Sequence, residues 1–153
     1  NAAIYVSCGK RFKSKENILD EGYRLFDGES EAAWQEGHPD SASEAIRFLI
    51  SEQARSMEKI GAPAALQYFK HQLSSGEKYI LNPNRFFYQT MKSSVVQMLS
   101  GNILRGDAFT ITEDLLSATR GIIYDWCLHN GSYNLSEKAL RVTDMVLSYY
   151  KKS

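Results

Sequence analysis

The sequence lacks several features that would assign it to a class at once. Its two cysteines, Cys8 and Cys127, have a separation that matches no zinc motif. Its 18 basic residues balance 18 acidic ones, so the whole chain has no net electrostatic attraction to nucleic acid or acidic lipid. No apolar run approaches the length of a membrane span, and no secretory signal is recognisable. These absences favour a cytoplasmic protein with reduced cysteines.

Sequence motifs for catalysis are also missing. There is no phosphate-binding glycine loop, no HExxH, no CxxC and no GxSxG. The three histidines have no cysteine or carboxylate at a spacing that demands a metal. Asp125 stands without a second acid, and Glu113 and Asp114 lie in a first helical turn, where the helix dipole favours negative charge. We therefore expect no enzyme activity, no cofactor and no metal.

The residues that are present describe a globular helical domain. Apolar residues make up 43% and charged residues 24% of 153 residues, which suits one domain with a sizeable core. Strict alternation of apolar and polar residues between turns is not found, so strands are not expected. The helical periodicity instead predicts an all-α bundle of about six helices, near residues 14–36, 41–60, 63–73, 83–99, 111–128 and 133–150.

Capping signals support these boundaries. Ser41 to Glu44 has the pattern of a capping box, and Gly37 to Pro39 is a helix stop. Asn82-Pro83 predicts the start of another helix. The helix after Ser41 carries the stripe Ala42, Ile46, Leu49, Gln53, Met57 and Ile60.

The segment from Ile111 to Tyr150 forms two amphipathic helices joined at residues 129–132, and each has two apolar stripes. The first helix has Ile111, Leu115, Ala118, Ile122 and Trp126 on one stripe, and Leu116, Ile123 and Cys127 on the other. The second has Leu135, Ala139, Val142 and Val146 on one side, and Leu140, Thr143, Leu147 and Tyr150 on the other. Such wide apolar surfaces predict that this hairpin faces both the core of its own domain and a partner. Which stripe faces the partner stays open.

Aromatic and methionine side chains are concentrated in the middle helices. Ordinary core is one interpretation. The other is an apolar cavity between helices that binds a small ligand. For that cavity the sequence suggests Trp34, Phe48, Tyr68, Phe87, Met91 and Tyr124.

Two stretches resemble the TetR family of transcriptional regulators. Residues 11–19, RFKSKENIL, resemble the junction at which the family's recognition helix ends and its linking helix begins. Residues 118–135, ATRGIIYDWCLHNGSYNL, resemble the penultimate helix of many members. The basic cluster Lys10, Arg11, Lys13 and Lys15 precedes the linking helix, although such a cluster alone is usually a solvated end. Gly9-Lys10 departs from the family's aromatic positions, and Ile4 to Cys8 matches poorly.

The resemblance implies a ligand-binding and dimerisation domain over residues 14–153, with the helix-turn-helix largely missing. Residues 1–13 would hold an expression remnant and the end of the DNA-binding domain. Lys15 would contact DNA phosphate, and the last two helices would form a four-helix bundle in a homodimer. The expected interface residues are Thr119, Ile122, Trp126, Ala139, Val142, Thr143 and Val146.

By the same resemblance, a small apolar or amphipathic effector would bind in the cavity and release the regulator, a repressor, from DNA. Two alternatives remain at this point. One is a small all-α enzyme that uses Tyr124, Asp125 and His129 in an aromatic pocket. The other is a helical interaction module without a cavity.

Overall fold

The computed structural model describes residues 15–37 and 39–153, with the side chains of residues 15–17 left out. Within these residues the chain forms six α-helices, one 3-10 turn and no strand, apart from one isolated bridge between Leu104 and Lys151. The helices are α2 (Lys15–Gly37), α3 (Ala42–Ile60), α4 (Ala62–Ser74), α5 (Phe86–Ser100), α6 (Ala108–Leu128) and α7 (Leu135–Tyr150), with the turn η1 (Tyr79–Leu81) before α5. The predicted all-α bundle of about six helices is confirmed.

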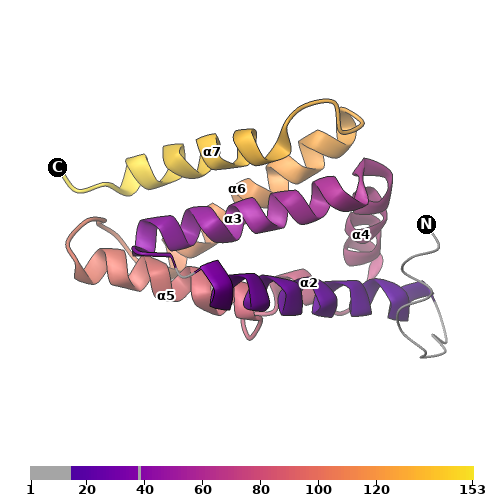
Figure 1. Cartoon of the computed structure of the whole chain (residues 1–153), viewed down its shortest axis with the longest axis horizontal. Helices are drawn as coiled ribbons and strands as arrows, with labels where there is room; N and C mark the ends of the chain where they lie inside the picture. Colours follow the sequence, from indigo (N-terminus) through magenta and orange to yellow (C-terminus); the bar gives the residue numbers. More distant parts are fainter. Residues whose placement is uncertain (1–14, 38) are drawn as a thin grey trace.

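Helix α3 occupies the middle of the bundle (Figure 1). It packs against α5 on one side and α7 on the other, and α6 and α7 pack against each other as a hairpin. Helix α2 runs along α3 and α5, while the short α4 lies across the end of α2 and α3 and contacts α6. This arrangement places α2, α3, α4 and α6 around a common space.

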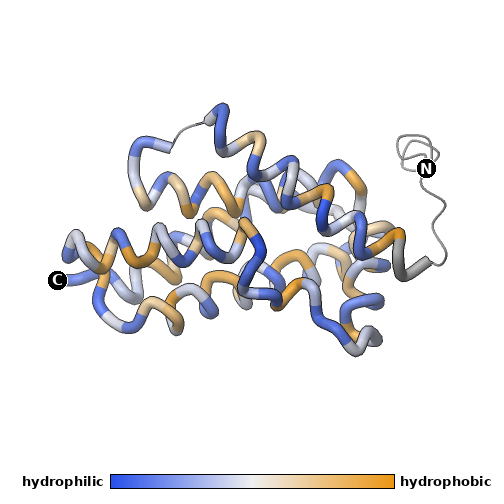
Figure 2. The backbone as a smooth tube through the Cα atoms, turned by 90° about the horizontal axis from the view of Figure 1, so that it is seen from below, coloured by the Kyte–Doolittle hydropathy of each residue, from blue (hydrophilic) through white to orange (hydrophobic). Residues whose placement is uncertain are grey.

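The core is formed where the helical stripes of these elements meet. Its fully buried large side chains are Ile46, Leu49 and Ile50 of α3, Met91 and Val95 of α5, Ile111, Leu115 and Ile123 of α6, and Leu135 of α7. Each such side chain contributes about 1.5–3 kcal/mol by leaving water. Apolar residues recur along every helix at helical intervals (Figure 2), as the sequence stripes predicted.

Helices α3, α6 and α7 begin at side-chain caps, Ser41, Asp107 and Asn134, whereas α4 and α5 begin without one. The Ser41 hydroxyl accepts a hydrogen bond from Glu44 N at 3.2 Å, so the predicted N-cap at Ser41 is confirmed. The reciprocal half of the capping box differs, because the Glu44 carboxylate accepts from Asp40 N at 3.2 Å, one residue before the N-cap. The predicted start at Asn82-Pro83 is wrong, because α5 begins at Phe86. Asn82 instead accepts from Asn84 N at 2.9 Å, a side-chain turn that holds the backbone out of a helix.

The α6–α7 hairpin turns through two residues in left-handed backbone conformation, Asn130 (φ 53°) and Gly131 (φ 73°). Trp126 Nε1 donates to Tyr133 O at 3.0 Å and closes the turn. A Cβ at Gly131 would lie 3.2 Å from the Trp126 ring, so glycine is needed for space as well as for conformation.

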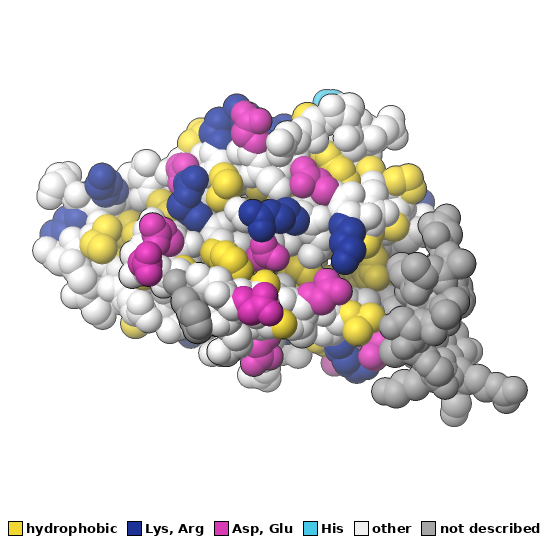
Figure 3. All heavy atoms as spheres, in the orientation of Figure 1, with side chains coloured by type: hydrophobic (Ala, Val, Ile, Leu, Met, Phe, Trp, Pro, Cys, Tyr) yellow, Lys and Arg dark blue, Asp and Glu magenta, His cyan; other side chains and the backbone are white. Residues whose placement is uncertain are grey.

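Positive and negative side chains alternate over the face formed by α2, α3 and α7, with no large region of one sign (Figure 3). Among the described residues, no helix has the length and apolarity needed to cross a membrane.

Candidate functional site

A cavity of about 390 Å³ lies among α2, α3, α4 and α6. This volume is within the ~300–1,000 Å³ of sites that take small organic ligands. Its apolar lining consists of Ile18, Leu25 and Phe26 of α2, Met57 and Ile60 of α3, Phe69 of α4, Ile80 of η1 and Ile123 of α6. The cavity is therefore an apolar space with one long wall supplied by α2.

Two tyrosines close the cavity between α2 and α4. The rings of Tyr23 and Tyr68 meet edge to face with centroids 5.3 Å apart. Tyr68 approaches Gly22 so closely that a Cβ there would lie 2.7 Å from two atoms of the Tyr68 ring. Burial raises the pKa of Tyr23 well above its ordinary value, and Arg85 opposes this only in part. Burial likewise raises the pKa of Tyr68, so both hydroxyls are neutral at physiological pH.

A buried ion pair lies beside these tyrosines. Arg85, just before α5, donates from Nε and Nη2 to the Asp27 carboxylate of α2 at 2.8 and 2.7 Å. Its guanidinium also lies 5.1 Å from the Tyr79 ring centroid and 5.6 Å from that of Tyr23. This bidentate pair joins α2 to the start of α5, and it occupies Arg85 within the protein.

Two other polar groups on the cavity wall have incomplete bonding. Gln53 Oε1 of α3 is buried and accepts no hydrogen bond from a described residue. Arg120 Nη2 of α6 lies 3.9 Å from Glu113 Oε2, which is beyond hydrogen-bond distance. The Arg120 side chain is only 23% exposed. Its burial lowers the pKa of Arg120, and Glu113 offsets part of that effect.

The six residues predicted for ligand binding are not gathered in one place. Tyr68 lines the cavity. Trp34 packs against Phe48 and Phe86 in a separate aromatic cluster, with ring centroids 6.1 and 6.3 Å apart. Phe87 and Met91 are buried in the core, where the Phe87 ring lies 5.9 Å from Phe26 of the cavity wall. Tyr124 is 49% exposed on α6.

Sequence reasoning did not select Gly22, Arg120 or Gln53 for the site. A signal for two of them was present. Gln53 interrupts the apolar stripe of α3, and Arg120 stands between Leu116 and Ile123 on a stripe of α6. A polar residue within an apolar stripe indicates a place where the helix meets something other than a dry core.

The alternative catalytic group, Tyr124, Asp125 and His129, contains a carboxylate held by structural partners. Asp125 Oδ2 accepts from the Tyr133 hydroxyl and from Lys138 Nζ, each at 2.8 Å. The bond from Lys138, followed by that from Tyr133, lowers the pKa of Asp125. The Asp125 carboxylate therefore links α6 to α7 through an ion pair with Lys138. Lys138 Nζ also lies 4.3 Å from the Tyr133 ring centroid.

Among the described residues, no group of three or more His, Cys, Asp or Glu side chains is placed to hold a metal ion. His71 of α4, which is buried, instead pairs with Asp20 of α2 at 2.9 Å. Cys127 is buried and free, and burial raises the pKa of its thiol. Cys8 and the side chain of Lys15 lie outside the described parts of the chain, so the phosphate contact of Lys15 stays a prediction.

The structure places most of the expected interface residues inside the chain's own core. Five of the seven are buried within one chain: Thr119, Ile122, Trp126, Ala139 and Thr143. Val142 and Val146 are partly buried and pack against the core cluster. Their own neighbours cover most of each of these five side chains, so little of their surface is left for a second copy. The second stripes are covered as well, since Leu116, Ile123, Cys127 and Leu147 are also buried.

Several large apolar side chains of the hairpin are exposed. They are Phe109, Tyr124 and Leu128 on α6, and Met145 and Tyr149 on α7. Met145 is 65% exposed and Tyr149 is 76% exposed. We call these five residues the hairpin face.

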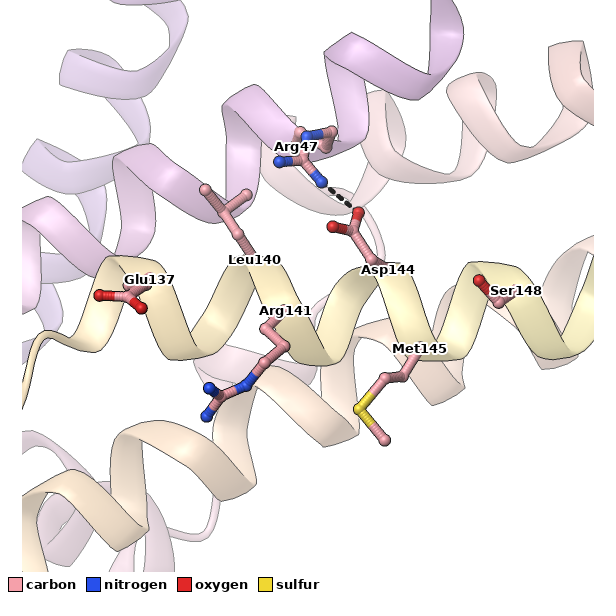
Figure 4. A pocket seen from close by; sticks show the side chains of 7 residues that line it. All are labelled: Arg47, Glu137, Leu140, Arg141, Asp144, Met145 and Ser148. Carbon is pink, nitrogen blue, oxygen red and sulfur yellow. Dashed lines mark hydrogen bonds and ion pairs between the residues drawn. The ribbon is translucent and has the colours of Figure 1, made fainter.

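An open groove with mixed charge lies between α3 and α7 (Figure 4). Arg47 of α3 pairs there with Asp144 of α7, while Arg141 and Met145 project from the other side of α7. This groove is shallow, and its Arg47 and Asp144 already bind each other. We therefore place the candidate site in the cavity beside α2.

No protein-family model, no curated protein and no solved structure matches the chain.

Proposed function

We propose that this chain is the ligand-sensing and dimerisation domain of a TetR-like transcriptional repressor that acts in the cytoplasm. One observation carries the proposal: the apolar cavity has its long wall on α2, and α2 begins within the stretch that resembles the family's junction between DNA-binding and linking helices. An effector in this cavity would touch the helix that leads to the DNA-binding domain.

The mechanism follows from the way α2 is held. On one side it is joined to the domain by the Asp27–Arg85 pair and by the contact of His71 with Asp20. Between these attachments its apolar side chains face the cavity. Filling the cavity pushes on this wall, and the displaced helix changes the distance between two DNA-binding domains of a dimer. Binding of effector and of DNA are then coupled through one movable element.

The hairpin face supports the dimer part of the proposal. Five large apolar side chains are exposed on the two helices of the hairpin, and a partner that covered them would remove apolar surface from water. A two-fold axis through α6 and α7 would pair this face with itself and build a four-helix bundle. The contacts would then come from the hairpin face rather than from the buried residues expected from the sequence.

A neutral apolar fluorophore, N-phenyl-1-naphthylamine, tests the ligand-sensing role. We expect saturable binding at one site per chain. Ser56→Phe, which fills the cavity from α3, should weaken binding, whereas Ser148→Phe on the outer side of α7 should not. Hydrogen exchange measured with bound fluorophore should slow in α2 and α3. Absence of binding, or equal binding by both variants, would reject the cavity as an effector site.

A further inference from the structure

The cavity wall contains a cation whose bonding capacity is largely unused. Arg120 offers five N–H donors, and none of them makes a hydrogen bond to a described residue. Its nearest acid, Glu113, is 3.9 Å away and also neighbours Tyr88, whose pKa is raised by burial and further by Glu113. Glu113 is therefore shared between two groups. A guanidinium that is partly withdrawn from water and has no hydrogen-bonded acid favours an added anion.

Helix α3 supplies a second polar group to the lining. Gln53 of α3 lines the same cavity, and the oxygen of its carboxamide is buried without a partner among the described residues. A buried polar atom without a hydrogen bond destabilises the fold, so such atoms are usually paired. The carboxamide has both a donor and an acceptor end and can turn to offer either one. It can thus bond an acid group or a hydroxyl on a ligand.

The other charged groups of the lining do not compete for this role. Arg85 already gives two hydrogen bonds to Asp27. Glu29 and Lys59 are exposed, and Glu21 accepts from Arg24 at 3.3 Å. The rest of the lining is mostly apolar, with Phe26, Met57, Phe69 and Ile123, and it adds the hydroxyls of Ser56, Tyr23 and Tyr68. The cavity therefore combines two polar groups with unused hydrogen-bonding capacity and a largely apolar surface.

We propose that the cavity binds an organic anion, whose carboxylate is held by Arg120 and Gln53 and whose apolar body lies against Phe26, Met57 and Ile123. This inference rests on the proposed ligand-sensing function and names its effector class. Planar guanidinium matches a carboxylate with two parallel hydrogen bonds, which a neutral ligand of equal apolar area cannot form. The cavity would thus select acids over the corresponding alcohols.

The test uses two ligands that share a tail, octanoate and 1-octanol, as competitors of bound N-phenyl-1-naphthylamine. For each variant we take the ratio of the two dissociation constants, octanol over octanoate. Replacing Arg120 by Met should lower this ratio about 10- to 100-fold, the effect of losing charge-assisted hydrogen bonds. Octanol binding should hardly change. Arg120→Lys keeps the positive charge but loses the planar guanidinium that donates two parallel hydrogen bonds, so it should give an intermediate ratio.

Arg141→Met is the matched control, because Arg141 is exposed on α7 outside this cavity. It should leave the ratio unchanged. If Arg120→Met is too unstable for binding to be measured, Gln53→Leu provides an independent test. It should lower the ratio of the dissociation constants in the same direction but by less. A ratio unaffected by both changes, while the fluorophore still binds, overturns the anion site and leaves the ligand-sensing function standing. Failure of the wild type to bind the fluorophore overturns both.

Discussion

The Tyr68 ring of α4 lies directly on Gly22 of α2. A Cβ added to Gly22 would overlap the Tyr68 hydroxyl and come within 2.7 Å of Cε1 and Cζ of the ring. Glycine in the interior of a 23-residue helix lowers helix stability, so its presence here needs a reason. Close approach of the tyrosine that closes the cavity is that reason.

Gly22→Ala should therefore destabilise the protein. Alanine favours the helix by about 1 kcal/mol, but the forced displacement of Tyr68 costs about 1–3 kcal/mol. Urea unfolding should show the net loss, and fluorophore binding should change because Tyr68 moves. Gly28→Ala is the control in the same helix, since nothing lies within 4 Å of a Cβ there. It should stabilise the protein by about 0.5–1 kcal/mol. Equal effects at the two positions would contradict the packing described for Gly22.

Glu58 of α3 caps the start of α7 from a distance of 77 residues in the sequence. Its carboxylate accepts from Leu135 N at 2.8 Å, Ser136 N at 3.3 Å and Ser136 Oγ at 3.0 Å. Glu58→Ala should lower the free energy of unfolding by about 1 kcal/mol, as for other lost caps. Glu52→Ala, which removes only a surface pair with Arg55, should cost less than about 0.5 kcal/mol. Chemical denaturation of both variants measures the difference.

The sequence predicted the helices because their signals are local. Apolar spacing and the Ser41 helix cap depend on residues within one or two turns, and both features are found in the structure. The start of α5 was missed because Asn82 has two local uses, as a helix cap and as a turn former. The Glu58 cap had no local signal at all, since its acceptor and donors are brought together only by packing of α3 on α7.

The site was harder to predict for a different physical reason. Helical periodicity identifies apolar faces but not what covers each one. The resemblance places Ile122 and Trp126 at a partner, whereas α6 buries them in its own domain. The bulk of an aromatic residue likewise does not distinguish Phe87 in the core from Phe26 on the cavity wall. The polar interruption of an apolar stripe at Arg120 was the more informative signal.

The bond of Asp125 with Lys138 and Tyr133 predicts acid sensitivity of the hairpin. These partners lower the pKa of Asp125 in the folded chain below the ordinary value of 3.8. A lowered folded pKa contributes stability that is present above pH 3.8 and is lost as the pH falls through the folded value. Asp125→Asn should therefore reduce the melting temperature at neutral pH, and its difference from wild type should shrink below about pH 4.

Lys138→Met provides the control for this pH effect. It removes the first partner of Asp125, so it should also lower the melting temperature at neutral pH. Adding Asp125→Asn to Lys138→Met should then cost less than it does alone, because the two residues share one interaction. A wild-type to Asp125→Asn difference that stays constant from neutral to acid pH would contradict the assigned pKa direction.

The hairpin face gives the sharpest test of dimerisation. Met145→Glu and Tyr149→Glu place a charge on exposed α7 positions, so the fold should survive, but a face buried against a second copy would have to desolvate that charge. Light scattering should show dimers for wild type and monomers for these variants, with circular dichroism unchanged. Leu73→Glu is the matched control, because Leu73 is 78% exposed on α4, away from the hairpin. It should remain dimeric. Ile122→Glu cannot replace these variants, since a carboxylate among buried α6 side chains would unfold the chain itself. Dimers that persist in both hairpin-face variants would show that any pairing uses another surface.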